Sequence, residues 1–254
     1  IEIRDDPESL QLFRDAGATV DGITVHFDAG HARALCATAP REFTQLARNP
    51  SRSVQIGGNH VVLAPTYGSP FVRDLEGGRR YGTIADFENF VKLTHSSPYL
   101  HHSGGTVCEP VDIPVSKRHL DMVYAHLRYS DKPIMGSVTA ASRAQDSVDL
   151  ATIAFGGDLA DRTVMTSLIN ASSPLVWDAT MLSSAEVYAS NHQACIITPF
   201  ILSGAMSPVT VAGTLTQVLA EVMAGTVSRT SRRVGWLRTV TSRRWARSEE
   251  RRVG

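Results

Sequence analysis

Hydrophobic runs recur along the second half of the chain at a nearly constant spacing. Candidate strands begin 34, 31 and 30 residues apart, near Tyr99, Pro133, Val164 and Ala194. A segment with helical periodicity follows each strand, at residues 114–128, 141–155, 178–191 and 207–224. A strand and a helix that repeat every ~30 residues are typical of βαβ units, in which the strands are parallel. The pattern therefore predicts four consecutive βα units over residues 99–225.

Three of the expected strands are almost continuously apolar, in the segments PIMGSV, VMTSLIN and ACIITPF. Such a composition is typical of strands that are covered on both faces of a parallel sheet. An α/β barrel and a doubly wound sheet both contain strands of this kind. No G-x-G-x-x-G follows any of these strands, so the sequence lacks the usual dinucleotide fingerprint. Four units are half the number in an eightfold barrel.

Residues 1–98 do not share this rhythm and predict a mixed α+β region. Its local signals are a helix over 7–16, a strand over 23–27, a helix capped by Asp28, a hairpin turn at Gly57-Gly58-Asn59 between strands 53–56 and 60–64, and a helix over 84–95 capped by Thr83. We therefore expect residues 1–98 to form the N-terminal cap region of the same domain as the repeat units.

The formal net charge of zero conceals two oppositely charged parts. Residues 226–254 contain nine Arg and two Glu, a net of +7, so residues 1–225 carry a net of −7. The arginines follow no helical or strand period, and the last eight residues match a translated DNA-sequencing adapter. We expect residues 226–254 to be a non-native tail outside the fold. The acidic remainder offers no basic face, which argues against a nucleic-acid partner.

Three sequence features bear on the cellular compartment. No run of about 18 apolar residues is present, so we expect no membrane span. The chain opens with IEIRDDPESL, without a signal peptide and without Met, and we expect further residues before Ile1. The three cysteines are far apart and odd in number. That usage fits a reducing compartment and predicts a cytoplasmic protein.

In parallel α/β folds the functional site forms at the C-terminal ends of the strands. The four expected ends, at residues 101–105, 137–139, 170–173 and 199–206, carry mostly small polar side chains. A zinc site made of His101, Cys108 and Cys195 would have no C-x-x-C or H-x-x-x-H spacing to support it. We therefore expect no metal site, and these residues alone leave the reaction open.

Seven segments, in order and covering most of residues 1–225, resemble the trimethylamine:corrinoid methyltransferase family. They are REFTQLARNP (41–50), VQIGG (54–58), GRRYGTIADFENFVKL (78–93), EPVDIPVSKRHLDMVYAHLRYSDKPIMG (109–136), RAQDSVDLATIAFG (143–156), LINASSPLVWD (168–178) and PFILSGAMSPVTVAGTLTQVLAEVMAG (199–225). Each segment alone is weak, but together they are specific at the level of the family.

The resemblance implies a TIM (β/α)8 barrel, of which this chain would hold the N-terminal cap and the first four units. The C-terminal half of the barrel would be missing, and we expect the chain to be inactive alone. The family moves a methyl group from a methylated amine to the cobalt of a corrinoid (cobalamin) carried by a separate protein. The substrate would be trimethylamine or a quaternary amine such as glycine betaine. The expected partners are the corrinoid protein and this small amine, and a homo-oligomer is compatible with the resemblance.

A quaternary amine is held by aromatic faces, at about 0.5–2 kcal/mol per contact. Tyr67 and Phe200 are aromatic candidates by position, and His101, Asn170 and Met206 lie at or after expected strand ends. These five are the candidate substrate-binding residues, and no catalytic residue is identified. A quaternary amine leaves as a neutral molecule, so the protein mainly has to position it.

Two other functions stay open at this point. One is a non-catalytic barrel that binds a quaternary amine, which would show calorimetric binding without any dependence on a corrinoid protein. The other is a zinc-dependent barrel methyltransferase, which stoichiometric zinc would indicate.

Overall fold

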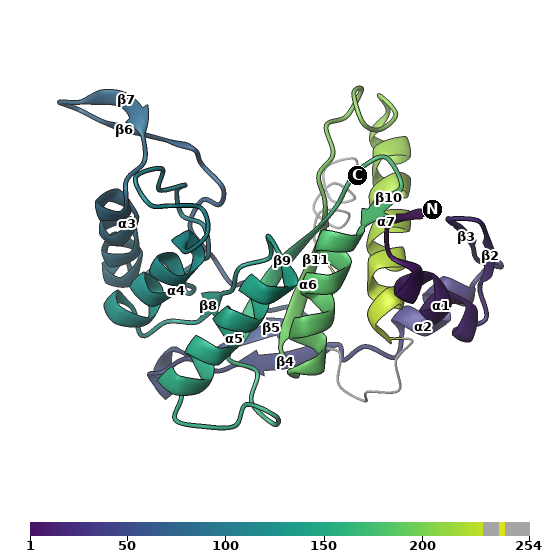
Figure 1. Ribbon diagram of the computed structural model, residues 1–254, viewed down its shortest axis with the longest axis horizontal. Coiled ribbons are helices and arrows are strands. Elements are labelled where there is room, and N and C mark those ends of the chain that lie inside the picture. The colour runs from purple at the N-terminus through teal and green to yellow at the C-terminus, as the bar shows by residue number, and fades with distance from the viewer. Residues whose placement is uncertain (231–238, 242–254) are drawn as a thin grey trace.

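The computed structural model describes residues 1–230 and 239–241 of the chain (Figure 1). Its helices are α1 Pro7–Asp15, α2 His31–Cys36, α3 Ile84–Ser96, α4 Arg118–Tyr129, α5 Ala141–Ala154, α6 Ala179–Ser190 and α7 Val211–Thr230. Its strands are β1 Glu2–Arg4, β2 Thr19–Asp21, β3 Thr24–His26, β4 Glu42–Gln45, β5 Val54–Gly57, β6 Phe71–Asp74, β7 Gly78–Tyr81, β8 Ile134–Met135, β9 Met165–Ala171, β10 Val176–Asp178, β11 Ala194–Pro199 and β12 Thr239–Thr241. None of the described helices combines the length and the apolarity that a membrane crossing needs.

A parallel sheet of four strands, in the order β12-β11-β9-β8, runs through the middle of the molecule (Figure 1). The connections between its strands contain α5, α6 and α7, and neighbours in the sequence are neighbours in the sheet. This confirms the strands expected near Pro133, Val164 and Ala194. The strand expected near Tyr99 does not form, and that region contributes only a single parallel bridge between Gly104 and Ile134.

The described part of the chain is therefore a mixed α/β structure with several small sheets and no closed barrel. The partial TIM barrel expected from the sequence is not confirmed. The βαβ rhythm was correct for three strands, but rhythm alone does not determine whether a sheet closes. Closure needs further strands to pair with the free edges of the sheet.

The N-terminal strands belong to a second sheet, with the order β10-β1-β3-β2. Here β1 pairs in parallel with β10, with Glu2 opposite Val176, and antiparallel with β3. The buried side chains of Ile3, Phe13 and Val25 lie in the same apolar core as residues of β9 and α7. The first strands of the chain thus share a core with α7, the last of the described helices, and the division expected at residue 98 stays a prediction.

Residues 53–64 do not form the expected hairpin. Instead β5 pairs antiparallel with β4, with Val54 opposite Gln45, and residues 60–64 are not a strand. Gly57 has a φ of 103°, and a Cβ at this position would overlap the carbonyl oxygen of Arg41. The glycine therefore permits a close approach of two chain segments, and it does not turn the chain into a hairpin.

The two expected helix caps have different outcomes. Thr83 and Asp86 form a capping box at the start of α3, in which Asp86 Oδ2 accepts from the Thr83 amide at 2.9 Å and Thr83 Oγ1 accepts from the Asp86 amide at 3.3 Å. Asp28 does not cap α2, because that helix begins after the left-handed residue Gly30 and has no side-chain cap. Of these two expected caps, only Thr83 is followed three residues later by a side chain that returns the hydrogen bond.

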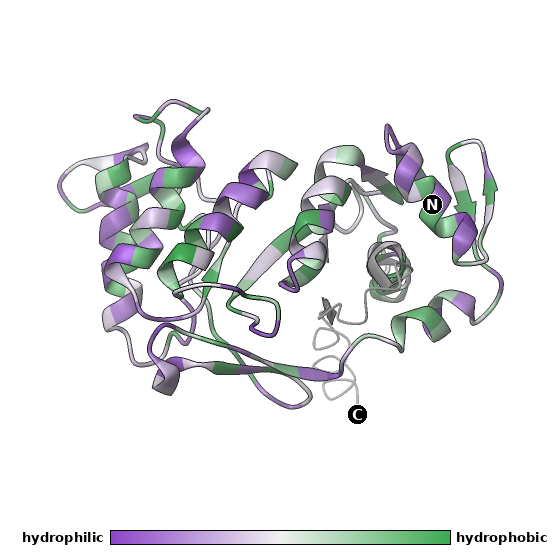
Figure 2. Ribbon diagram, turned by 60° about the horizontal axis from the view of Figure 1, so that its bottom comes forward, coloured by the Kyte–Doolittle hydropathy of each residue, from purple (hydrophilic) through white to green (hydrophobic). Residues whose placement is uncertain are grey.

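A smaller lobe contains β6, β7, α3 and α4, at the left of Figure 1. Its buried apolar cluster consists of Val72, Phe87, Val91, Val107, Cys108 and Ala125. Figure 2 shows that hydrophobic and hydrophilic residues alternate around the helices of the molecule, as expected of helices that are covered on one side. The lobe is joined to the parallel sheet by the segment between α4 and β8.

Helix α7 continues to Thr230, which is five residues past the boundary expected at residue 225. Thr226, Val227 and Ser228 are buried, and β12 pairs in parallel with β11. The remainder of the expected tail, residues 231–238 and 242–254, lies outside the described residues.

Candidate functional site

A cavity of about 90 Å³ lies beside the C-terminal end of β8, between that strand, α4 and the start of α5. A single water needs about 10–15 Å³ of such space, so the cavity is large enough for a small organic molecule. Its lining includes Tyr67, Thr106, Glu109, Arg118, His119, Met122, His126, Ser137 and Arg143. The site therefore uses helix side chains as well as the end of a strand.

Gly105 allows the aromatic ring of the cavity to come close to the backbone. A Cβ on Gly105 would lie 2.8 Å from Tyr67 Cε2 and 3.0 Å from Met135 Cβ, closer than ordinary side-chain contacts. The amide of Gly68, next to Tyr67, donates to the Thr106 carbonyl at 2.7 Å and fixes the loop in place. The ring of Tyr67 is thus held at the wall of the cavity.

Three charged side chains line the cavity, and two of them neutralise each other. Arg118 NH1 lies 2.5 Å from Glu109 Oε1 and its NH2 donates to the Ile113 carbonyl at 3.1 Å. Arg143 donates to Thr139 Oγ1 at 2.9 Å, and within the described residues it forms no ion pair. One guanidinium therefore remains available for an anionic group of a ligand.

His119 on α4 is 7% exposed and lines the same cavity. Its Nε2 lies 2.7 Å from Asp146 Oδ2, while its buried Nδ1 has no hydrogen-bond partner among the described residues. A carboxylate can only accept, so in the neutral ring Nε2 carries the proton and Nδ1 keeps its lone pair. A buried acceptor without a partner costs free energy unless a ligand or water satisfies it.

His126, one turn of α4 further on from Met122, closes the inner wall of the cavity. Its Nε2 donates to the Gly105 carbonyl at 2.7 Å, and its Nδ1 lies 2.7 Å from Ser103 Oγ. Burial lowers the pKa of His126 to about 4. Burial and the neighbouring His126 lower the pKa of His102 to about 3. Both rings are neutral at physiological pH and act as structural hydrogen-bonding groups.

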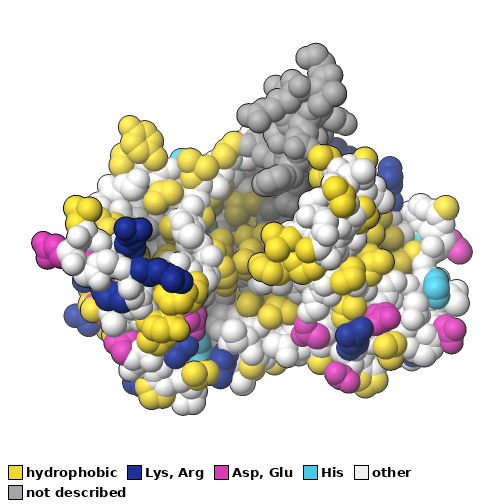
Figure 3. Space-filling view, turned by 90° about the horizontal axis from the view of Figure 1, so that it is seen from above, with side chains coloured by type: hydrophobic (Ala, Val, Ile, Leu, Met, Phe, Trp, Pro, Cys, Tyr) yellow, Lys and Arg dark blue, Asp and Glu magenta, His cyan; other side chains and the backbone are white. Residues whose placement is uncertain are grey.

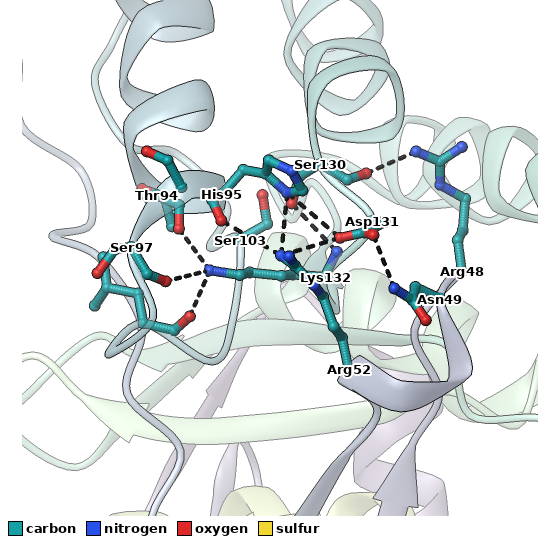
Figure 4. A network of polar contacts seen from close by, with 12 residues as sticks. Arg48, Asn49, Arg52, Thr94, His95, Ser97, Ser103, Ser130, Asp131 and Lys132 are labelled. Carbon is teal, nitrogen blue, oxygen red and sulfur yellow. Dashed lines mark hydrogen bonds and ion pairs between the residues drawn. The ribbon is translucent and has the colours of Figure 1, made fainter.

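A second polar cluster, shown in Figure 4, lies where α3 meets the start of β8. Lys132 is 7% exposed, and its Nζ donates to the carbonyl oxygens of Thr94, Ser97 and Leu100 at 2.7, 2.8 and 2.7 Å. Beside it, Asp131 accepts from Asn49 Nδ2 at 3.1 Å and pairs with Arg52 at 3.2 Å. We name Lys132 with its three carbonyl partners the lysine cage.

Only one of the five expected substrate-binding residues, Tyr67, lines the cavity. His101 is exposed and its Nδ1 accepts from the Leu63 amide at 3.0 Å. Asn170 accepts from Thr198 Oγ1 at 2.6 Å, and the Met206 carbonyl accepts from Gln217 Nε2 at 2.8 Å. Phe200 is 69% exposed. The structure does not bring these four to the cavity, and their roles stay predictions.

Phe200 belongs to a group of exposed apolar side chains in and after the loop that follows β11. The others are Leu202, Val209 and Val211. Figure 3 looks onto this end of the molecule, and hydrophobic side chains are common on the face it shows.

The residues that the sequence reasoning missed, His119, Arg118 and Arg143, lie on helices and not at strand ends. A signal for His119 exists in the helical period. Positions 119, 122, 123 and 126 are spaced as one helix face, and all four line the cavity. Two histidines on an otherwise apolar face mark it as chemically different from an ordinary packing face.

No three His, Cys, Asp or Glu side chains of the described part of the chain come together as a metal site requires. The described part of the chain is thus a mixed α/β structure with a cavity that is lined by an aromatic ring and by side chains of both charges.

The chain belongs to the trimethylamine methyltransferase (MTTB) family, whose model matches residues 1–234. It is 44% identical over 227 residues to the glycine betaine methyltransferase of Desulfitobacterium hafniense (strain Y51), covering 89% of this chain and 47% of the relative. It is 26% identical over 230 residues to the proline betaine:corrinoid methyltransferase of Eubacterium limosum, covering 87% and 47%. It is 25% identical over 241 residues to the L-carnitine:corrinoid methyltransferase of Eubacterium limosum, covering 88% and 48%. The chain spans about half the length of these curated relatives.

Proposed function

We propose that this chain is part of a methyltransferase that moves a methyl group from a betaine to the cobalt of a corrinoid carried by a partner protein. By betaine we mean a small molecule with both a quaternary ammonium and a carboxylate. The three relatives support this substrate class, because glycine betaine, proline betaine and L-carnitine all combine these two groups. Trimethylamine has no carboxylate, and it fits the cavity less well.

The single observation that carries the proposal is the pairing of opposite recognition elements in one cavity. The ring of Tyr67, with the Glu109 carboxylate nearby, suits the quaternary ammonium. The guanidinium of Arg143, which forms no ion pair within the described residues, suits the carboxylate. A cation or an anion alone would leave one of these elements unused.

The corrinoid supplies the nucleophile, and the chain has to bind and orient the amine. A cavity of about 90 Å³ is far smaller than a corrin macrocycle, which supports a corrinoid that is presented by a separate protein. The quaternary nitrogen leaves as a neutral tertiary amine, so the main task of the residues around it is positioning.

We extend the proposal to the architecture and the compartment. The order β8, β9, β11, β12, with one helix in each connection, supports the first part of an α/β barrel behind a cap formed by residues 1–98. The widely spaced cysteines support a cytoplasmic protein.

The test is calorimetric titration of the chain with glycine betaine and with choline, which carries the same trimethylammonium group but no carboxylate. We expect glycine betaine to bind more tightly. Arg143→Met should weaken glycine betaine binding about tenfold and leave choline binding unchanged, because a charge-assisted hydrogen bond is lost only for the carboxylate. Tyr67→Ala should weaken the binding of both ligands.

Arg73→Met provides the matched control, since Arg73 is exposed on β6 and lies outside the cavity. If Arg143→Met weakened the binding of glycine betaine and of choline equally, Arg143 would not be the group that recognises the carboxylate.

A further inference from the structure

We infer that Ser147, together with Tyr188, is a positioning residue that holds Arg143 toward the cavity and so determines the preference for an amine that carries a carboxylate. The inference rests on the proposed function, in which Arg143 recognises the carboxylate. It is carried by a closed set of hydrogen bonds that links the end of β8 to the first turns of α5. Neither Ser147 nor Tyr188 is among the described residues that line the cavity, so both act on the ligand through Arg143.

Ser147 lies on α5, one turn after Arg143, and it is 0% exposed. Its hydroxyl donates to the Arg143 carbonyl at 2.8 Å and accepts from the Ser137 amide at 3.1 Å. Ser137 follows β8 and lines the cavity. A single buried oxygen thus joins the end of the strand to the helix residue that carries the guanidinium.

Tyr188 is also buried, and it reaches the end of β8 from α6. Its hydroxyl donates to the Ser137 carbonyl at 2.6 Å. Gly136 makes this approach possible, because a Cβ at that position would overlap the hydroxyl oxygen of Tyr188. The N–H and the C=O of Ser137 are therefore both bonded to buried side chains, which come from two helices. These bonds fix the backbone at this end of the cavity.

The guanidinium of Arg143 closes the set of contacts. Arg143 NH1 donates to Thr139 Oγ1 at 2.9 Å, and Thr139 lies two residues after Ser137. Helix α5 has no side-chain cap at Ala140, so these bonds, and not a cap, fix its first turn. An arginine whose backbone and guanidinium are both bonded in this way loses less conformational entropy when it binds a carboxylate.

The side of the cavity that suits the quaternary ammonium does not depend on these contacts. Arg118 holds Glu109, and a backbone hydrogen bond from Gly68 holds the loop of Tyr67. Removal of the Ser147 hydroxyl should therefore loosen the carboxylate-binding side and leave the ammonium-binding side in place. Glycine betaine needs both sides, whereas choline needs only the second, so the ratio of the two affinities reports on the positioning.

The test is calorimetric titration of the chain with glycine betaine and with choline. Ser147→Ala removes the hydroxyl and little else. It should weaken glycine betaine binding about fivefold and change choline binding less than about twofold. Tyr188→Phe acts on the other backbone group of Ser137 and should have the same selective effect.

Thr152→Val is the matched control. Thr152 Oγ1 donates to the Val148 carbonyl at 2.9 Å, so the substitution removes a helix hydrogen bond of the same kind, on the same helix and outside the cavity. It should change neither affinity.

Thr139 allows a test at an exposed position, where a substitution does not threaten folding. Thr139→Val removes the oxygen that accepts from Arg143 and should weaken glycine betaine binding about threefold, with choline binding unchanged. Thr139→Ser keeps that oxygen and should bind both ligands as the unmodified chain does. Equal affinities for Thr139→Val and Thr139→Ser would contradict the last contact of the set.

A double variant shows whether Ser147 acts through Arg143. In Arg143→Met the guanidinium is absent, so the further change Ser147→Ala should weaken glycine betaine binding no more. An additional loss in the double variant, equal weakening of both ligands by Ser147→Ala, or no change in either would overturn the positioning role while the betaine site stands. If Arg143→Met by itself leaves the preference for glycine betaine over choline unchanged, the proposed recognition of the carboxylate fails as well.

Discussion

The lysine cage and the cavity share the segment 97–105, whose first residues contact Lys132 and whose last residue lines the cavity. The polar groups of the cage all have partners, whereas some of those in the cavity do not. All three protons of the Lys132 ammonium are matched by carbonyl oxygens at 2.7–2.8 Å. In the cavity, Arg143 has no carboxylate partner within the described residues and His119 Nδ1 has no partner there at all. A saturated buried charge fixes the backbone, whereas unsaturated groups are available to a ligand. Lys132 is therefore a residue that stabilises the protein, whereas Arg143 is a residue that can recognise a substrate.

The largest expected effect tests the lysine cage. Lys132→Met keeps most of the length of the side chain but removes three hydrogen bonds to a charged group, each of which contributes about 1.5–3 kcal/mol. We expect the free energy of unfolding in urea to fall by about 4 kcal/mol, since part of the loss is recovered by water. The affinity for betaine should change little in the fraction that stays folded.

Lys92→Met is the control for this experiment. Lys92 lies 3.7 Å from Glu88 in an exposed pair on α3, and such a pair contributes about 0.5 kcal/mol. If Lys92→Met and Lys132→Met lowered the free energy of unfolding by similar amounts, the lysine cage would contribute no more to stability than an ordinary surface lysine.

The next effect concerns pH. The pKa of His126 is lowered by burial from 6.5 to about 4, so between these values the unfolded chain binds a proton that the folded chain does not. The stabilisation is complete above pH 6.5 and is lost as the pH falls towards 4, by about 3 kcal/mol in total. Unfolding in urea at a series of pH values measures this slope.

His126→Asn should lower stability at neutral pH, because Ser103 and Gly105 lose a partner, and it should reduce the slope between pH 4 and 6.5 by about half. The other half remains because burial also lowers the pKa of His102, to about 3. Asp86 does not interfere, because its pKa is lowered by Arg80 and it titrates in the folded chain only below 3.8. An unchanged slope in His126→Asn would mean that His126 titrates normally in the folded chain.

The smallest effect belongs to the cavity. Arg143→Met removes a guanidinium that contacts only Thr139 Oγ1 among the described polar partners. We expect the free energy of unfolding to change by less than about 0.5 kcal/mol, which urea titration can establish. A decrease of more than about 2 kcal/mol in the free energy of unfolding would show that Arg143 stabilises the fold and would contradict a role in ligand binding alone.

The sequence predicted the repeating part of the fold well, because amphipathic helices such as α5 and buried strands such as β9 carry strong periodic signals. It failed around Tyr99. There the chain is extended, but the amides of His101 and His102 donate to the Leu63 carbonyl, and Ser103 donates to Pro133. An extended segment that bonds to a distant loop has the same local composition as a strand, and local patterns cannot distinguish the two.

The candidate site was less accessible to sequence reasoning for a related reason. The general rule for parallel α/β folds directs attention to strand ends, and this led to His101, Asn170 and Phe200. The cavity instead draws His119, His126, Arg118 and Arg143 from α4 and α5, and Tyr67 and Glu109 from loops. The pairing of His119 with Asp146 spans 27 residues and two helices, so only the packing of α4 against α5 brings them together.

The pairing of β1 with β10 has a consequence for how the chain is made. Strand β1 finds its neighbour β10 only after the ribosome has added the residues between Arg4 and Val176, and its core partners on α7 come later still. At ~5–20 residues per second, roughly 10–40 s pass before that core can assemble. Ile3, Phe13 and Val25 spend this interval without their native neighbours on β9, β10 and α7. The N-terminal segment therefore cannot complete the burial of its apolar side chains until α7 has been synthesised.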